Sequence, residues 1–268
     1  MFPIKPMPTL HQEARRTEPD QASGDPVHSL DHSFGNQSVK PDERRLRIRQ
    51  VFDAVAPRYD LMNDLMSLGI HRLWKRKLAR RVAGIQGQVV DLAGGTGDVA
   101  RLLLAPGRQV TVCDPSLAMM QAGQQRPSSE HIVWLTGEAE HLPLPDASVD
   151  LLTISFGLRN TTHLVTALSE IRRVLKPGGY FVCLEFSRPA RWLAPFYDLY
   201  SYWVIPRLGA AVAGAPQAYQ YLIDSIRLFP DQNGFAALMS QAGLAEVTWE
   251  NLSFGIACLH FGKRPHDL

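Results

Sequence analysis

The chain reads Asp91-Leu92-Ala93-Gly94-Gly95-Thr96-Gly97-Asp98 between an apolar strand-like pair, Val89-Val90, and a helix-like run over residues 99–104. A strand, a glycine-rich turn and a helix together form a pocket in which the backbone can approach a polar, nucleoside-like ligand closely. The stretch therefore predicts a ligand-binding turn. The residues expected to bind are Asp91, Gly94, Gly95, Thr96 and Gly97.

Two ligand classes fit this turn. Dinucleotide folds use a G-x-G-x-x-G/A pattern after their first strand, which Gly95-Thr96-Gly97-Asp98-Val99-Ala100 satisfies loosely. S-adenosylmethionine fits the charges better, because Asp91 can accept a hydrogen bond from its ammonium group. Asp98 at the helix start would also repel a pyrophosphate. We favour S-adenosylmethionine over NAD, and a tight turn without a ligand is the third interpretation.

A second acidic residue, Asp114, ends a strand predicted over residues 109–114. It follows the glycines by about 20 residues, the spacing at which a carboxylate reaches a ribose diol. The alternative is a cap for the helix predicted over residues 116–124. NAD and S-adenosylmethionine both carry a ribose there, so Asp114 supports a nucleoside site without naming the ligand.

Composition limits the possible classes of function. The 268 residues are 45% hydrophobic and 20% charged, as in ordinary globular proteins, and the net charge of +2 predicts no nucleic-acid partner. The three cysteines lie in apolar stretches without metal-ligand spacing, which favours reduced thiols, no metal and a cytoplasmic location. No apolar run approaches the ~20 residues that span a bilayer. The cysteines are Cys113, Cys183 and Cys258.

Strands and helices alternate along most of the chain, which predicts an α/β fold with a mostly parallel sheet and helices on both faces. Strands are expected over 88–92, 109–114, 132–136, 149–155 and 180–186, and helices over 98–104, 116–124 and 163–175. Lys176-Pro177-Gly178-Gly179 should turn the chain sharply into the fifth strand.

The C-terminal third breaks this alternation. Residues 192–229 are aromatic and helical without a strand, and residues 245–251 and 256–261 predict a terminal antiparallel hairpin. Sheets that bind S-adenosylmethionine end in such a pair, whereas dinucleotide folds add a parallel strand. The turn and the hairpin together resemble the Rossmann-like class I methyltransferases.

Four further segments resemble one family, the ubiquinone/menaquinone biosynthesis C-methyltransferases. The resemblance covers roughly residues 34–263 and implies methyl transfer from S-adenosylmethionine to a ring carbon of a polyprenylated benzoquinol or naphthoquinol. We expect residues 1–40 to be a disordered arm and residues 41–268 to be the class I methyltransferase domain. The segments are YDLMNDLMSLGIHRLW at 59–74, ISFGLRN at 154–160, RVLKPGG with LEFS at 173–187, and SIRLFPDQ at 225–232.

The resemblance also implies roles for individual residues. Thr96, Asp114, Glu138, Ala139 and Ser155 should bind the methyl donor, with Glu138 and Ala139 near the adenine. The family often has Asn or Asp where this chain has Glu138, which puts its direct contact in doubt. Surface or strand-end polarity is the alternative for Glu138 and Ser155.

Four residues are candidates for catalysis. Arg159 and Asn160 follow the fourth strand, at the edge where such sheets bind ligands. Arginine is a poor base, so we expect Arg159 to stabilise a phenoxide, with a structural ion pair as the alternative. Tyr59 could line the pocket or relay a proton. His71 could act as a base near neutral pH, although a structural histidine is the commoner case.

A hydrophobic acceptor needs a hydrophobic route. We expect residues 192–229 to form a helical cover over the carboxyl edge of the sheet, enclosing an isoprenoid tail or touching a membrane surface. Ordinary packing of an extra helix is the alternative. Association with a membrane face, a quinone-biosynthesis complex or a second copy is compatible with this function. The aromatic residues are Trp192, Phe196, Tyr197, Tyr200, Tyr202 and Trp203.

A basic cluster could approach anionic lipid, or could be a solvated helix face. The other classes that remain are a class I methyltransferase for another small molecule or RNA, a binding subunit without activity, and an NAD oxidoreductase. The cluster comprises Arg72, Lys75, Arg76, Lys77, Arg80 and Arg81.

Overall fold

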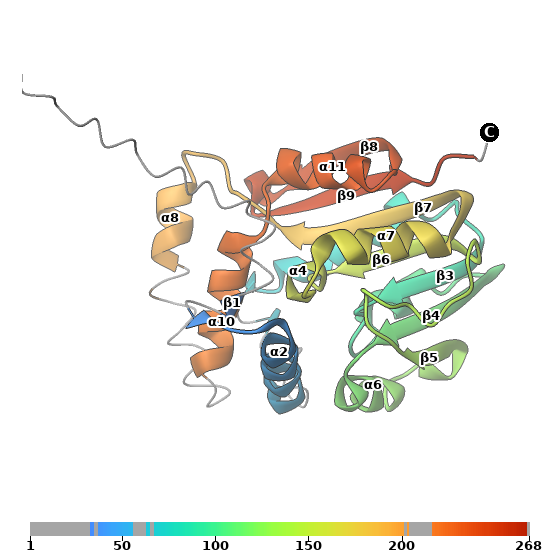
Figure 1. Cartoon of the computed structure of the whole chain (residues 1–268), viewed down its shortest axis with the longest axis horizontal. Helices are drawn as coiled ribbons and strands as arrows, with labels where there is room; N and C mark the ends of the chain where they lie inside the picture. Colours follow the sequence, from blue (N-terminus) through green and yellow to red (C-terminus); the bar gives the residue numbers. More distant parts are fainter. Residues whose placement is uncertain are drawn as a thin grey trace, which may run out of the picture.

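The computed structural model describes residues 33–34, 37–55, 63–64, 67–200, 203 and 216–266. Within these residues, one seven-stranded sheet has the order β5-β4-β3-β6-β7-β9-β8 (Figure 1). Strands β3 to β7 pair in parallel, β9 runs antiparallel to β7, and β8 runs antiparallel to β9. The predicted mostly parallel sheet with a terminal hairpin is confirmed. The strands are β3 Gly87–Leu92, β4 Arg108–Asp114, β5 Ile132–Thr136, β6 Val149–Ser155, β7 Leu175–Phe186, β8 Ala245–Leu252 and β9 Ala257–Lys263.

Helices cover both faces of the sheet, as the alternation predicts. On the near face in Figure 1, α7 (Leu164–Val174) and α11 (Gln232–Gln241) bury apolar residues against β6 and β7. On the opposite face, α4 (Ile70–Arg81), α5 (Asp98–Leu103) and α6 (Leu117–Gln124) complete a second core with β3 and β4. Each helix presents one apolar stripe to the sheet, and this burial orients the strands and their carboxyl ends.

The carboxyl ends of the parallel strands lie at the left in Figure 1, next to α2 (Pro41–Val55), α8 (Ala194–Leu199) and α10 (Pro216–Leu228). Helices α8 and α10 belong to the predicted cover over 192–229. Residues 201–202 and 204–215 of that cover lie outside the described residues. Sequence analysis did not place α2 at this edge.

Side chains from α2 and α10 meet at η3 (Leu158–Asn160), the short 3-10 helix that follows β6. The Arg44 guanidinium, 1% exposed, donates to the carbonyl oxygens of Thr161 at 2.7 Å and Arg159 at 3.2 Å. The Tyr221 hydroxyl donates to Asn160 Oδ1 at 3.0 Å. These bonds fix both helices to the loop after the fourth parallel strand.

Part of the segment predicted to be disordered is described. Strands β1 (Ser33–Phe34) and β2 (Gln37–Ser38) pair antiparallel, and the Phe34 ring stacks 4.8 Å from that of Tyr221. The remainder of the predicted 1–40 arm lies outside the described residues. In the described helices, none is both long and apolar enough to cross a membrane.

The turn predicted at Lys176-Pro177-Gly178-Gly179 lies inside β7. Leu175 pairs with Val149 and Tyr180 pairs with Leu151, so four residues of β7 oppose a single residue of β6. The glycine with φ +81°, Gly178, supplies the left-handed conformation that this irregularity requires. Strand β7 therefore begins at Leu175 and not at the predicted Tyr180. The four residues predicted as a turn form a bulge within the strand.

Candidate active site

Asp91 ends β3 and ties the glycine-rich turn to its surroundings. Its side chain accepts hydrogen bonds from the Ala100 amide at 3.0 Å and from the Thr153 hydroxyl at 2.9 Å. Burial raises the pKa of the Asp91 carboxyl to about 7, against the lowering effect of the Thr153 bond. A carboxylate offers about four acceptor positions, so Asp91 keeps capacity for a ligand ammonium. It lines a small polar pocket with Lys75, Thr96 and Ser155.

The glycines shape the turn as predicted. Gly95 has φ +54° and Gly97 has φ +75°, conformations that disfavour other residues. A Cβ on Gly94 would lie 2.9 Å from the carbonyl oxygen of Asp91, so a side chain there would collide with the strand end. Gly94, Gly95 and Thr96 line the same polar pocket as Asp91.

The charge of Asp98 is neutralised locally. Its carboxylate lies 3.3 Å from Lys75 Nζ, 2.7 Å from Arg101 Nη2 and 3.1 Å from Arg126 Nη1. Burial raises the pKa of Asp98, but attraction to these three cations outweighs it and the pKa is lowered. Asp98 should therefore repel a pyrophosphate less strongly than its position in the sequence predicts.

Asp114 accepts hydrogen bonds from two backbone amides at the cleft that it lines. Oδ2 accepts from Gly95 N and Oδ1 accepts from Ser116 N, both at 2.8 Å. Burial raises its pKa to about 6, against these two hydrogen bonds. The helix cap considered as its alternative role belongs instead to Ser116, whose hydroxyl accepts from Met119 N.

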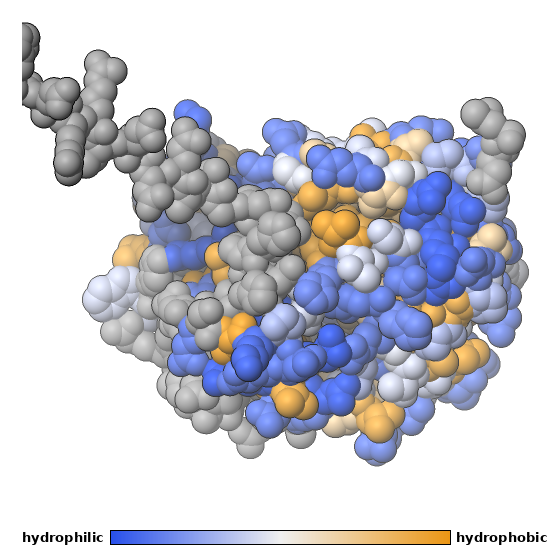
Figure 2. All heavy atoms as spheres, viewed as in Figure 1, coloured by the Kyte–Doolittle hydropathy of each residue, from blue (hydrophilic) through white to orange (hydrophobic). Residues whose placement is uncertain are grey.

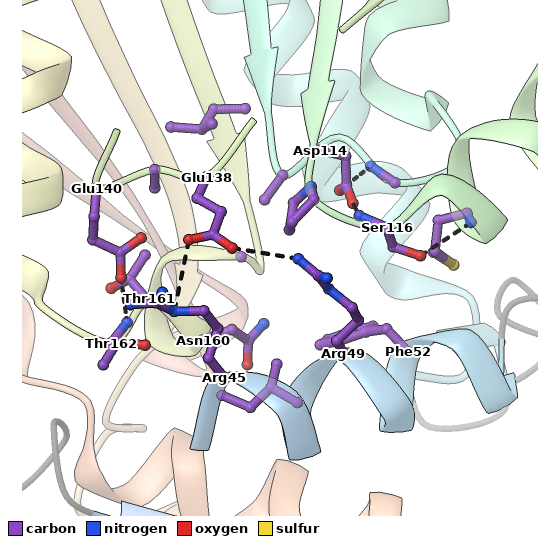
Figure 3. A pocket seen from close by; sticks show the side chains of 18 of the residues that line it. Arg45, Arg49, Phe52, Asp114, Ser116, Glu138, Glu140, Asn160, Thr161 and Thr162 are labelled. Carbon is purple, nitrogen blue, oxygen red and sulfur yellow. Dashed lines mark hydrogen bonds and ion pairs between the residues drawn. The ribbon is translucent and has the colours of Figure 1, made fainter. Parts of the chain in front are cut away.

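Figure 3 shows the larger cleft, lined by Asp114, Glu138, Ala139 and Asn160 and closed on one side by α2. From α2, Arg49 reaches Glu138 at 3.4 Å and Arg45 reaches it at 3.6 Å. Glu138 therefore lies at the cleft with its carboxylate bound by two arginines of α2, of which Arg49 is 89 residues away in the sequence.

Ser155 supplies an unsatisfied polar atom at the polar pocket. Its hydroxyl oxygen is buried and has no hydrogen-bond partner among the described residues. The pocket and the cleft share Ala93 and Gly95, so they form one continuous path along the turn. Backbone amides, carboxylates, an ammonium and a free hydroxyl fit a nucleoside that carries a zwitterionic amino acid.

A second, apolar pocket lies on the far side of an aromatic wall. It has a volume of about 270 Å³ and is lined mainly by α8, α10 and the start of α4. The rings of Phe156 and Phe186 lie 4.6 Å apart, and that of Trp74 lies 6.1 Å from Phe156. Phe156 lines the cleft, while Phe186 and Trp74 line the apolar pocket. A polar site and an apolar site thus share this wall at one edge of the sheet.

Arg159 lies behind the wall, in a buried ion pair. Its Nη1 is 2.7 Å from Glu185 Oε1, and the two side chains are 5% and 1% exposed. The guanidinium carbon lies 5.4 Å from the Phe186 ring centre, and Nε has no partner among the described residues. The predicted alternative, an ion pair, is present, and Arg159 lines neither the cleft nor the apolar pocket.

The remaining catalytic candidates differ in what the structure shows. The His71 ring contacts the Ser67 hydroxyl at 2.7 Å and lies 3.8 Å from Asp64. Burial lowers its pKa to about 4, which makes it a weak base near neutral pH. Asn160 lines the cleft, whereas Tyr59 lies outside the described residues.

Comparison with known proteins identifies the family. The model of the ubiE/COQ5 methyltransferase family matches residues 38–264. The chain is 64% identical over 236 residues to the ubiquinone/menaquinone biosynthesis C-methyltransferase UbiE of Rubrivivax gelatinosus, covering 88% of this chain and 94% of that protein. The chain belongs to the ubiE/COQ5 methyltransferase family. Membership confirms the resemblance and makes the protein a methyltransferase.

Other members and folds agree with this placement. The mitochondrial 2-methoxy-6-polyprenyl-1,4-benzoquinol methylase of Mus musculus is 41% identical over 271 residues, covering 85% of this ubiE/COQ5 chain and 83% of its own. A S-adenosylmethionine-dependent methyltransferase from Thermotoga maritima superposes with a TM-score of 0.60 at 18% identity, over 81% of this chain and 99% of that one. The latter likeness shows the fold.

Three residues of this ubiE/COQ5 site were not predicted as such. Lys75 was assigned to the basic cluster, yet it is buried at the polar pocket. Its spacing of three and four from Leu78 and His71 is the signal that indicates an inward face. Glu185 and Phe156 were quoted only as parts of motifs. No group of His, Cys, Asp and Glu that could hold a metal ion occurs in the described part of the chain.

Proposed function

We propose that this protein methylates a ring carbon of a polyprenylated benzoquinol or naphthoquinol in ubiquinone or menaquinone biosynthesis. Bound S-adenosylmethionine supplies an electrophilic methyl group; the ring carbon attacks it, the C–S bond breaks and the ring carbon loses a proton to solvent. The relatives' names describe such reactions. The chain's own residues must bind the donor, exclude water and align the ring.

The juxtaposition of the two sites carries the proposal. The cleft, which is continuous with the polar pocket, meets the apolar pocket at the wall formed by Trp74, Phe156 and Phe186. A methyl group passes directly from sulfur to carbon, so both reactants must lie within near-attack distance in line. A polyprenylated quinol requires an apolar pocket of this kind next to the donor, whereas a polar acceptor would not.

The ion pair of Arg159 with Glu185 suits a supporting electrostatic role. An arginine remains protonated throughout, so it cannot remove the ring or hydroxyl proton. A fixed cation behind an aromatic wall can stabilise the phenoxide that makes the ring more nucleophilic. Asn160, held by the Tyr221 hydroxyl at 3.0 Å, can orient a quinol hydroxyl at the cleft.

Purified protein tests the reaction directly. Incubation with S-adenosylmethionine carrying a deuterated methyl group and a short-tailed demethylated quinol should give one labelled methyl on a ring carbon, read by mass spectrometry and NMR. Benzoquinol and naphthoquinol acceptors in parallel would decide which ring is used. Binding of NAD without S-adenosylmethionine, or label on oxygen, would contradict the proposal.

Deletion of the gene tests the cellular role. The quinone pool of the deletion strain should become lighter by one methyl group, and the plasmid-borne gene should restore it. An unchanged pool in a strain without a second such enzyme would count against the proposal.

The mouth of the apolar pocket also fits a membrane surface. Leu68, Phe196 and Leu199 are 74%, 66% and 60% exposed, and Figure 2 shows a few separate apolar side chains among hydrophilic ones at the left of the view. The Trp192 and Phe254 rings pack 5.2 Å apart and are also exposed. We propose that this apolar surface inserts at the boundary between lipid headgroups and acyl chains, next to the hydrocarbon layer that dissolves a polyprenyl tail.

The basic cluster contributes less to this contact than its sequence indicates. Lys75 is buried, Arg72 pairs with Asp64, and Lys77 and Arg81 lie next to Glu250.

Sedimentation with phosphatidylglycerol vesicles tests the membrane contact. Phe196→Ser should weaken this sedimentation severalfold. Val165→Ser, an equally simple change at an exposed site on α7, should not. If both variants sediment with the vesicles as strongly as wild type does, the membrane proposal is contradicted.

A further inference from the structure

Lys75 is a buried lysine whose side chain lines the polar pocket beside the glycine-rich turn. Its side chain is 8% exposed, and it shares the pocket with Asp91, Thr96 and Ser155. It belongs to the inward face of α4, together with the buried residues Trp74 and Leu78. A lysine is rarely buried unless an opposite charge compensates its ammonium group.

The hydrogen bonds of this ammonium are incomplete. Lys75 Nζ donates to Asp98 Oδ2 at 3.3 Å, longer than the ~2.7–2.9 Å usual for a charge-assisted bond. An ammonium carries three N–H donors. Asp98 is the one hydrogen-bond acceptor of Lys75 among the described residues, so two donors are available to a ligand.

Asp98 has cationic partners other than Lys75. Arg101 and Arg126 both contact Asp98 Oδ1, at 2.7 and 3.1 Å, so this carboxylate does not depend on Lys75 for neutralisation. The other acid of the pocket, Asp91, already accepts bonds from Ala100 and Thr153. The Lys75 ammonium can therefore bind a ligand anion in the pocket without leaving Asp98 unpaired.

We propose that Lys75 binds the carboxylate of the amino-acid portion of S-adenosylmethionine, an inference that rests on the proposed function. Asp91 and Lys75 then present opposite charges to the two charged groups of that amino acid. The ammonium group faces Asp91 and the carboxylate faces Lys75, with the unsatisfied Ser155 hydroxyl beside them. This arrangement determines the direction in which the amino acid enters the pocket.

Decarboxylated S-adenosylmethionine is the probe, because it lacks only the carboxylate. Calorimetry of the full chain should show that wild type binds S-adenosylmethionine roughly 10- to 100-fold more tightly than the decarboxylated compound, as loss of a charged hydrogen bond predicts. Lys75→Met should lose this preference. Its affinity for S-adenosylmethionine should fall by the same roughly 10- to 100-fold, while its affinity for the decarboxylated compound stays within about threefold.

Lys77→Met is the matched control. Lys77 lies two positions further along α4, pairs with Glu250 and is 43% exposed, and it does not line the polar pocket. This variant should keep the wild-type preference. Lys75→Gln should repeat the result of Lys75→Met with a polar side chain, and the melting temperatures of all variants show whether they fold.

Three results would overturn the inference or its foundation. Equal binding of the two compounds by wild type would overturn it without any variant. If Lys75→Met and Lys75→Gln weaken the binding of both compounds equally, Lys75 only supports Asp98. Failure of wild type to bind S-adenosylmethionine would overturn the proposed function itself, which distinguishes the two claims.

Discussion

The Arg159 guanidinium and the Glu185 carboxylate lie 2.7 Å apart, and neither side chain is more than 5% exposed. Glu185 also accepts a hydrogen bond from the Phe186 amide at 2.9 Å. Burial raises the pKa of Glu185, against the attraction of Arg159. The pair joins the ends of β6 and β7 directly behind the aromatic wall.

Removing one member of this pair should lower the stability of the fold more than removing both. Glu185→Leu leaves a buried guanidinium without its counterion and should destabilise the fold by about 3–5 kcal/mol, whereas Arg159→Met with Glu185→Leu should cost less. Urea unfolding of the two single variants and the double variant measures this. The double variant should bind S-adenosylmethionine normally but transfer methyl groups slowly. Additive losses of stability would contradict the interdependence of the pair.

Asp114→Asn should weaken donor binding. The amide cannot accept from both Gly95 N and Ser116 N and also from a ribose hydroxyl, so affinity should fall roughly 10- to 100-fold. Because the pKa of Asp114 is raised to about 6, wild-type affinity should rise as the pH increases through 6, and the variant should show less of this rise. Asp146→Asn is the control, since its exposed carboxylate pairs with Arg173 and does not line the cleft. Unchanged affinity in Asp114→Asn would refute its role.

Gly123→Ala should destabilise the protein although alanine favours helices. A Cβ at this position in α6 would lie 2.6 Å from the Thr96 carbonyl oxygen and 2.5 Å from the Trp134 ring. Overpacking of this kind costs about 1–3 kcal/mol and should shift Thr96 away from the donor. Thermal unfolding and donor titration measure both effects. Gly84→Ala, whose Cβ meets nothing within 4 Å, should be neutral.

Acid should destabilise the protein through two buried histidines. Burial lowers the pKa of His71 and of His260 to about 4, from about 6.5 in the unfolded chain. The stability that depends on the neutral rings is complete above pH 6.5 and is lost as the pH falls toward 4, at most about 3 kcal/mol per ring. NMR titration of the two rings checks this. Titration of His71 near 6.5 would restore it as a candidate base.

The alternation of strands and helices was sufficient to predict the sheet, its carboxyl edge and the terminal hairpin. The positions of Thr96 on the turn and of Asp114 at the strand end could be predicted because local sequence determines both. The bulge in β7 could not be predicted, because a proline and two glycines fit a turn as well as a bulge. Only the pairing of Leu175 and Tyr180 with β6 distinguishes the two.

Contacts between distant segments account for what sequence analysis missed. Arg159 meets Glu185 only because β6 and β7 are neighbours, and Glu138 meets Arg49 only because α2 crosses the cleft. Neither pair has a sequence separation that matches the period of a helix or a strand, so no local pattern indicates it. Lys75 was misplaced for a different reason. Of the other five basic residues in the cluster, four are exposed and Lys77 is half-buried, so the sequence gives Lys75 the look of one more solvent-facing charge.

Helix α2 is attached unequally at its two ends. Arg44 is buried and bonded to backbone carbonyls, whereas Arg49 and Asp53 hold Glu138 and Ser116 through exposed side chains. Exposed ion pairs are worth about 1 kcal/mol or less and weaken with salt. Salt should therefore weaken the contact of Arg49 with Glu138 while the buried bonds of Arg44 persist, and we expect the spent nucleoside to depart faster at high ionic strength.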